Sequence, residues 1–203
     1  MINQSKLLIL IAGFFAITLT QLSAQDALSI GPRAGVNISS VSNVDNSKSL
    51  SGLALGLTST YSINQSTGLT LDILFSNQGF AVGEDEYKIN YVQVPLYFDL
   101  FFGELGTAFR PKVYAGVAPH FLLKAKYNEE QVSKEQLNSF NFAVSGGLGF
   151  NLRMTNRVWL NTDLRAFLGL NDYRDKNFQT ENKRAMSTVQ FSLGLAYGLS
   201  KLD

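Results

Sequence analysis

The chain has 203 residues, a formal net charge of +1 and no cysteine, and its length suits one domain with a sizeable core. The near-neutral charge offers no basic field for nucleic acid. The absence of cysteine excludes disulfides, thiol catalysis, cysteine-built metal sites and a lipid-anchored cysteine.

The first 24 residues have the composition of a secretory signal peptide. Lys6 makes the start positive, residues 7–19 form one apolar run, and Ala24 closes a short stretch suited to cleavage. The run is short for a membrane-spanning helix, although an uncleaved anchor is the alternative. We therefore expect a signal peptide at residues 1–24 and an exported domain at residues 25–203.

After this segment, apolar and polar residues alternate with a period of two, which is the pattern of β-strands with two different faces. The alternation is clearest in residues 89–100, where Val94 and Leu96 face one way and Gln93 and Pro95 face the other. In chain order, the pattern predicts eight strands, at residues 28–40, 51–62, 68–79, 89–100, 112–126, 139–152, 157–171 and 187–200.

The connections between these strands alternate in character. Polar loops are expected at residues 40–50, 80–88, 126–138 and 171–187, short turns at 63–67 and 153–156, and a connection of intermediate length at 101–110. An even number of long strands with short turns at one end is typical of a transmembrane barrel, and lipid forces such a sheet to close. We predict an all-β fold, an eight-stranded antiparallel up-and-down transmembrane β-barrel in the outer membrane of a Gram-negative bacterium, surrounded by outer-membrane lipid.

The two faces of the predicted strands differ in chemistry. One face is almost wholly aliphatic or aromatic, whereas the other mixes small polar residues with charged ones: Arg33, Asp72, Lys112, Lys124, Asp163 and Arg165. The export signal favours lipid on the apolar side, so the charged face should line the lumen, where buried charges must pair. We predict a lumen network that plugs the barrel, formed by Arg33, Asp72, Lys112, Asp163 and Arg165; a narrow polar pore is the alternative.

Three prolines, Pro32, Pro95 and Pro119, fall within the predicted strands. Proline removes a hydrogen bond from the ladder between strands, and a closed barrel has no free edge that could accommodate this loss. We therefore expect a β-bulge or a rim position at each of the three residues.

Six fragments carry a family resemblance: Ile30–Ser39, Leu69–Gly79, Tyr91–Leu96, Val113–Leu123, Ser145–Leu152 and Arg165–Asp172. With these fragments in order, the mature chain resembles the PorT-like outer-membrane β-barrel proteins. The resemblance implies an eight-stranded outer-membrane barrel, associated in some members with secretion or surface-protein maturation. The chain departs from many outer-membrane barrels because it ends in Asp203 rather than in an aromatic residue, so assembly signals would rest on Phe191 and Tyr197.

Candidate chemistry in the sequence is sparse. The single histidine, His120, has the same inward phase as Ser145, and a lipid hydrolase would need such a base and nucleophile. A lone inward histidine is more often a satisfied lumen residue, so no catalytic residue is predicted. Glu84–Glu86 and Glu129–Glu130 lack the spacing of a calcium loop, and Gly146–Gly149 has no following helix that would bind a nucleotide. No metal site and no cofactor are expected.

The leading hypothesis is a non-enzymatic integral outer-membrane protein with a structural or protein-contact role in secretion or envelope assembly. The predicted loops, including the mixed-charge residues 172–184, are the expected contact surfaces for other envelope or secretion proteins. A small-ligand binder with a lumen cavity and a lipid-modifying enzyme are the alternatives, and no nucleic-acid partner is expected.

Overall fold

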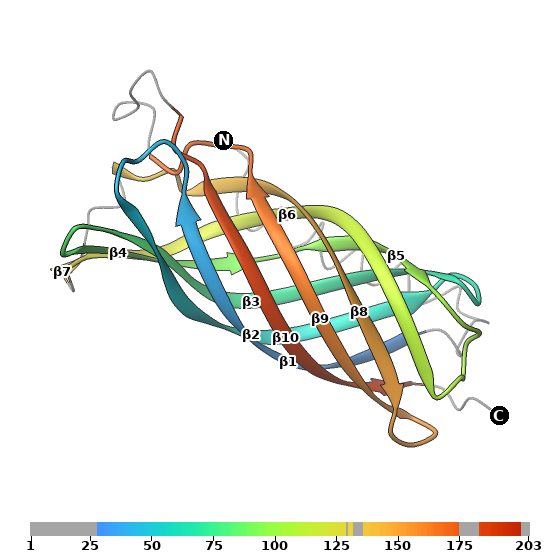
Figure 1. The fold of residues 1–203 in the computed structure, drawn as a ribbon. Helices are drawn as coiled ribbons and strands as arrows, with labels where there is room; N and C mark the ends of the chain where they lie inside the picture. The colour runs from blue at the N-terminus through green and yellow to red at the C-terminus, as the bar shows by residue number, and fades with distance from the viewer. Residues whose placement is uncertain (1–27, 129, 132–135, 175–182, 200–203) are drawn as a thin grey trace, which may run out of the picture.

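The computed structural model describes residues 28–128, 130–131, 136–174 and 183–199, so the predicted signal peptide at residues 1–24 lies outside the described part. These residues form β1 (Leu28–Val41), β2 (Ser47–Ser62), β3 (Thr67–Val82), β4 (Asp85–Gln93), β5 (Leu96–Phe101), β6 (Phe109–Tyr127), β7 (Glu130–Gln131), β8 (Phe140–Arg153), β9 (Val158–Gly169) and β10 (Met186–Gly198). Neighbouring strands pair antiparallel, and β1 also pairs with β10, so the sheet closes into a barrel (Figure 1).

Eight positions make up the ring in the described part of the chain. Strands β4 and β5 share one position, because each pairs with β3 on one side and with β6 on the other. The two-residue β7 pairs only with the end of β6. This arrangement confirms the predicted fold class, an eight-stranded antiparallel up-and-down barrel.

Among the described residues, no helix is long and apolar enough to cross a membrane.

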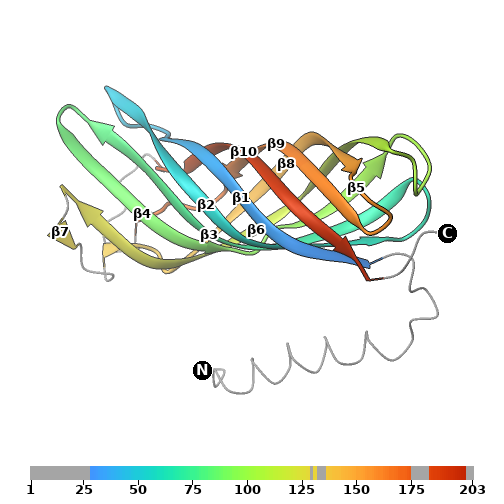
Figure 2. The ribbon, with the colours of Figure 1, turned by 90° about the horizontal axis from the view of Figure 1, so that it is seen from below.

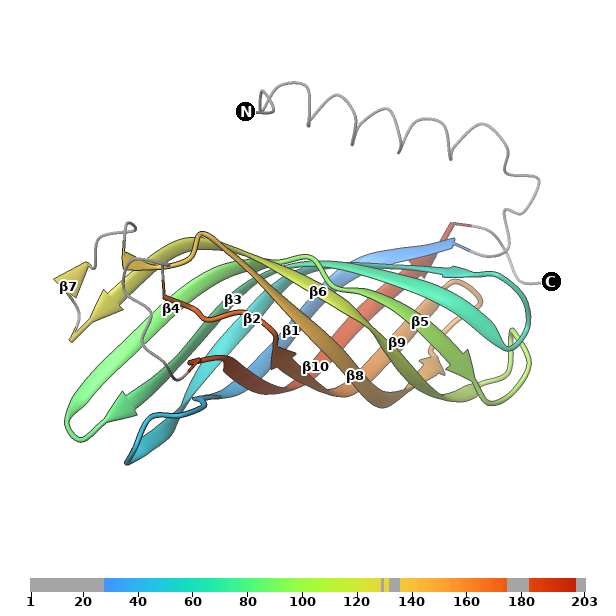
Figure 3. The same ribbon diagram turned by 90° about the horizontal axis from the view of Figure 1, so that it is seen from above.

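The two ends of the barrel differ. Because bacterial outer-membrane barrels have short turns on the periplasmic side, we call inner the end at which β1 starts and β10 finishes beside the short connections that follow β2, β5 and β8 (Figure 2). At the outer end, the β3–β4 hairpin and the end of β6, with β7 beside it, project farthest (Figure 3).

The orientation of the two faces of the strands agrees with the prediction. Outward side chains are aliphatic or aromatic and well exposed, with Leu55 at 51% and Ile38 at 59%. Inward polar side chains such as Asp72 and Asp163 are fully buried. The apolar face therefore points outward, where lipid would surround it, and the charged face lines the lumen.

Aromatic pairs mark the edges of the apolar belt. The ring centroids of Phe121 and Phe140 lie 5.4 Å apart toward the outer end, and Phe109 and Phe150 form a similar contact at the inner end. Aromatic rings prefer the interface between lipid and water. The outer parts of β3, β4 and β6 therefore extend beyond the lipid.

Two of the predicted loops are mostly strand. β2 already begins at Ser47, so little remains of the loop expected at residues 40–50, and within 80–88 only Gly83 and Glu84 connect β3 to β4. Gly83 has a φ of 65°, a conformation that a tight turn often requires of glycine. The prediction of these loops is wrong because, beyond the lipid belt, the outward face meets water, as at the exposed Lys88, while the inward face is apolar, as at the buried Phe80. The apolar-out and polar-in alternation is therefore lost there.

The strand predicted at residues 89–100 is interrupted at Val94 and Pro95, as the proline rule predicts. In an antiparallel sheet, the N–H and C=O of one residue point to the same neighbouring strand. The Pro119 carbonyl accepts a hydrogen bond from the amide of Val94 at 2.9 Å. The backbone N–H that proline lacks would point to the same side, so its absence also falls at the interruption between β4 and β5.

Pro32 and Pro119 themselves lie inside the continuous strands β1 and β6, so the expectation of a bulge or rim position is wrong for both. Gly31 and Pro32 are not paired with β10, but the register between β1 and β10 is the same on both sides of them. Proline therefore costs this sheet a hydrogen bond and does not shift the strands.

A bulge in β6 changes which face of the strand one charged residue occupies, compared with the prediction. Asn90 of β4 pairs with Lys124, whereas the next residue, Tyr91, pairs with Leu122, so Leu123 is the extra residue. Beyond the bulge, the buried position passes to Ala125, which is 3% exposed. The prediction that Lys124 shares the inward phase of the lumen charges is therefore wrong.

Candidate functional site

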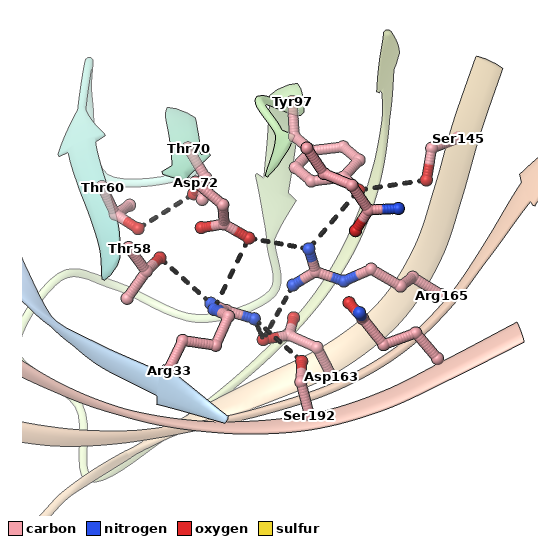
Figure 4. A network of polar contacts seen from close by, with 12 residues as sticks. Arg33, Thr58, Thr60, Thr70, Asp72, Tyr97, Ser145, Asp163, Arg165 and Ser192 are labelled. Carbon is pink, nitrogen blue, oxygen red and sulfur yellow. Dashed lines mark hydrogen bonds and ion pairs between the residues drawn. The ribbon is translucent and has the colours of Figure 1, made fainter. Parts of the chain in front are cut away.

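The five charged residues of the predicted network converge in the middle of the lumen. Arg33 comes from β1, Asp72 from β3, and Asp163 and Arg165 from β9 (Figure 4). Lys112 comes from β6. Each occupies an inward position of its strand, and each is at most 3% exposed. The period of two in the strands thus delivers all five side chains into one small volume.

Asp163 is the centre of this network. Its carboxylate accepts a hydrogen bond from the Arg33 guanidinium at 2.5 Å and lies 3.0 Å from Nζ of Lys112. A third cation, Arg165, is 3.8 Å away and makes its closer ion pair with Asp72, at 2.7 Å. The carboxylate of Asp163 is therefore surrounded by three cations.

The structure adds a third carboxylate that the predicted set does not contain. Asp99 of β5 is fully buried, lies 3.9 Å from Nζ of Lys112 and accepts a hydrogen bond from Thr70 at 2.6 Å. The signal for it is present in the sequence, because Asp99 has the same phase as the inward Gln93 and Tyr97. With it, three carboxylates, Asp72, Asp99 and Asp163, face the three cations.

Neutral side chains complete the network. The Arg33 guanidinium donates hydrogen bonds to the hydroxyls of Thr58 and Ser192. On the other side, the Arg165 guanidinium lies 5.1 Å from the ring centroid of Tyr97, whose hydroxyl is 3.0 Å from that of Ser145 (Figure 4). Paired charges and aromatic rings fill the cross-section, as expected for a barrel of eight strands.

His120 and Ser145 do not form a catalytic pair in this arrangement. The Ser145 hydroxyl donates to the carbonyl of Ala166 at 2.8 Å, and Nε2 of His120 lies 3.2 Å from the side-chain amide of Gln93. A nucleophilic serine needs its base within hydrogen-bonding distance. Within the described residues, no group of three or more His, Asp or Glu side chains could hold a metal ion.

The outer end of the lumen is built differently, around a cavity of about 370 Å³. Its wall is apolar and aromatic: the ring of Phe80 stacks on Tyr87 at 4.8 Å and meets Tyr173 edge-on at 5.6 Å. Ile89 and Ala125 add aliphatic surface. These positions were not predicted as a site, because sequence patterns assign the ends of β3 and β4 to a loop.

The rim of this cavity carries an ordered ion pair. Asp172 accepts hydrogen bonds from Nε and Nη2 of Arg174, at 3.0 and 2.7 Å, and from the backbone amides of Arg174 and Arg184. Burial raises the pKa of Asp172, but these hydrogen bonds outweigh burial and hold the pKa below its usual value. Burial raises the pKa of Tyr173 beside it.

Among the other sequence candidates, Asp85 within Glu84–Glu86 and the two arginines of the predicted mixed-charge loop, Arg174 and Arg184, line this cavity. Glu86 pairs with Lys88 at 2.8 Å on the β3–β4 hairpin, and Gly146–Gly149 lies inside β8. Glu129 and residues 175–182 of the predicted mixed-charge loop lie outside the described residues.

Comparisons with known proteins agree with this architecture. The family model described as "Outer membrane protein beta-barrel domain" matches residues 21–175. A comparison with curated proteins finds no match.

Several solved structures share the fold. Neisserial surface protein A has a TM-score of 0.59 at 12% identity, and the alignment covers 84% of this chain and 96% of that one. OprG from Pseudomonas aeruginosa has a TM-score of 0.53 at 17% identity, with 84% and 95% covered. Outer Membrane Protein W of E. coli has a TM-score of 0.53 at 14% identity, with 85% and 97% covered. Identities this low show a common fold and no more.

Proposed function

Because the chain belongs to the outer membrane protein β-barrel domain family, we propose that it is a closed, non-enzymatic barrel that acts through protein contacts at the cell surface. Its location is the outer membrane of a Gram-negative bacterium. The finer part of the proposal is a PorT-like role in secretion or envelope assembly, and the sequence fragments Ile30–Ser39 and Tyr91–Leu96 support it.

The contrast between a filled lumen and projecting outer strands carries this proposal. Three cations and three carboxylates occupy the middle of the barrel, and their three shortest ion pairs, at 2.5, 2.7 and 3.0 Å, argue against a conducting pore. Beyond the aromatic edge of the belt, the chemistry of the outer surface changes. There the opposed side chains of Asn77 and Asn90 hydrogen-bond at 2.6 Å in place of apolar contacts with lipid.

Site-specific photocrosslinking in the intact outer membrane tests the contact surface. A photoreactive residue at Glu84, on the exposed tip of the β3–β4 hairpin, should give discrete crosslinked proteins. The same residue at Asn156, exposed in the inner turn between β8 and β9, is the matched control. Crosslinks from Asn156 alone would contradict a contact surface at the outer end.

Two further measurements address the alternatives. Planar-bilayer recordings of the purified barrel should stay at the background conductance, and regular channel openings would support a narrow pore instead. If the protein modified lipids, His120→Ala would change the lipid A profile of the cell, whereas the present proposal expects the profile of the wild type.

A further inference from the structure

The cavity at the outer end combines an aromatic wall with cationic side chains, and protein contacts at the cell surface do not explain this combination. Besides Phe80, Tyr87 and Tyr173, the described residues of its lining include the cationic Lys126, Arg174 and Arg184 and one carboxylate, Asp85, while Asp172 pairs with Arg174 at the rim. An apolar wall with a few charged groups on one side is typical of a small-molecule site, and about 370 Å³ lies within the usual range of roughly 300–1,000 Å³ for such sites.

The arginines at the rim are placed to receive an anion. Asp172 fixes the Arg174 guanidinium through its two hydrogen bonds, so this side chain has little rotational freedom left to lose on binding. Within the described part of the chain, Nε of Arg184 is buried and has no hydrogen-bond partner, so this N–H retains capacity for an acceptor. Arginine is well suited to carboxylates and phosphates because its planar donors match their oxygens.

The cavity has a closed floor. Below it, Tyr91 and Met186 belong to the buried cluster that also contains Phe80 and Ile89. Farther in, Phe167 packs with small alanines above the charge network. Among the described residues, these packed side chains therefore separate the cavity from the charge network in the middle of the barrel.

We propose that this cavity binds a small amphipathic anion, with an acyl or aromatic body against Phe80 and Tyr87 and a carboxylate or phosphate beside Arg184. Burial of the apolar body supplies the attraction, and the guanidinium selects for negative charge. The ligand could be a free fatty acid or the acyl chain of a neighbouring membrane lipid, because both present the same chemistry.

Dye binding to the full barrel in phosphatidylcholine nanodiscs tests the proposal without competing detergent. The probe is 8-anilinonaphthalene-1-sulfonate, an aromatic anion, with empty nanodiscs as the blank. We expect a saturable signal that decanoate displaces, and 1-decanol should displace it at least about 10-fold less well, the size of one charge-assisted hydrogen bond. A signal equal to the blank, or equal competition by decanol, would overturn the proposal.

Two variants locate the site, and each has a matched control at the inner end. Arg184→Gln should weaken displacement by decanoate about 10-fold, and Val82→Phe, which fills the cavity, should abolish dye binding. Arg157→Gln and Val158→Phe make the same changes far from the cavity and should bind as the wild type does. Barrel folding is checked for all four by heat-dependent gel mobility. Folded outer-end variants that bind normally would overturn the proposal.

Mass spectrometry of lipids extracted from the barrel after purification from native outer membrane distinguishes the two sources. A stoichiometric fatty acid identifies a free ligand, whereas a stoichiometric phospholipid or glycolipid that Arg184→Gln loses identifies a membrane source. An extract that is the same for the wild type and for Val82→Phe contradicts binding in this cavity. None of these outcomes depends on protein crosslinking, so this proposal and the proposed function can fail separately.

Discussion

The middle of the lumen and its outer end lie on the same strands but differ in how they are filled. In the middle, Asp163 has cations at 2.5 and 3.0 Å, and the cross-section is filled by paired charges. At the outer end, the aromatic residues Phe80, Tyr87 and Tyr173 surround a cavity of about 370 Å³. The difference indicates that the middle closes and stabilises the barrel, whereas the outer end of the lumen has space and charge available for a ligand.

The largest expected effect is in the middle. Asp163→Asn keeps the shape of the side chain but leaves Arg33, Lys112 and Arg165 facing two carboxylates instead of three. Removing one partner of a buried ion pair typically costs about 3–5 kcal/mol. We expect a loss of this size in the free energy of unfolding, measured by denaturant titration in lipid vesicles with fluorescence of the single tryptophan, Trp159.

A lipid-facing neighbour on the same strand provides the control. Thr162→Ala, one residue away on β9 and outside the network, should change the free energy of unfolding by about 0.5 kcal/mol or less. The double variant Arg33→Met/Asp163→Leu removes one charge of each sign and should recover part of the loss. Equal effects of Asp163→Asn and Thr162→Ala would show that the network contributes nothing to stability.

A pair of glycine substitutions compares the space available in the two regions. In the middle, a Cβ on Gly147 would collide with the carbonyl oxygen of Leu164 and lie 2.7 Å from the hydroxyl of Tyr114. Gly147→Ala should therefore cost about 1–3 kcal/mol by overpacking. At the outer hairpin, a Cβ on Gly83 meets nothing within 4 Å, and only its φ of 65° opposes substitution.

Overpacking at Gly147 and backbone strain at Gly83 can be distinguished by comparing alanine with asparagine at each position. Gly83→Ala should cost about 1 kcal/mol, because alanine is strained at positive φ, and Gly83→Asn should cost less, because asparagine tolerates this conformation. At Gly147, asparagine is larger than alanine and should cost more. The free energy of unfolding of each variant is measured by denaturant titration. If alanine and asparagine ranked in the same order of destabilisation at both positions, the two regions would be packed alike.

Much of this fold could be predicted from the sequence, because the barrel interior and the lipid impose opposite chemistry on alternate residues. That alternation places Arg33, Asp72 and Arg165 in the lumen without knowledge of the pairing between strands. The alternation fails where lipid no longer borders the strands or where a bulge shifts their phase. Beyond the belt, the outward face meets water and the inward face is apolar, so the outer ends of β3 and β4 do not show the expected alternation. The bulge at Leu123 reverses the phase that would place Lys124 inside.

The sequence contributes less to the site. Alternation shows that lumen charges must pair, but which ones meet depends on the register of strands far apart in the chain: Arg33 and Asp163 are separated by 130 residues. The cavity could not be predicted at all. Its walls come from strand ends assigned to loops and from Tyr173 and Arg184, which the barrel pattern does not place.

The smallest expected effect is at the rim of the outer cavity and depends on pH. The folded chain holds the pKa of Asp172 below its ordinary value, because Arg174 and two backbone amides donate hydrogen bonds to the carboxylate. A pKa that is lower in the folded than in the unfolded chain contributes stability above the unfolded pKa, about 3.9. This contribution is lost as pH falls through the folded pKa.

Asp172→Asn removes the titrating group, so the difference in unfolding free energy between wild type and variant isolates its contribution. We expect a difference of about 1 kcal/mol at pH 6, which shrinks steadily as the pH is lowered below 4 in parallel denaturant titrations. The exposed Asp45, substituted to asparagine in the same way, controls for the change in net charge. A difference that stays constant down to the lowest pH would mean that Asp172 positions Arg174 through shape alone. In that case, acid would leave the anion-binding rim intact, and the contrast between a charge-stabilised middle and a pH-sensitive outer end would disappear.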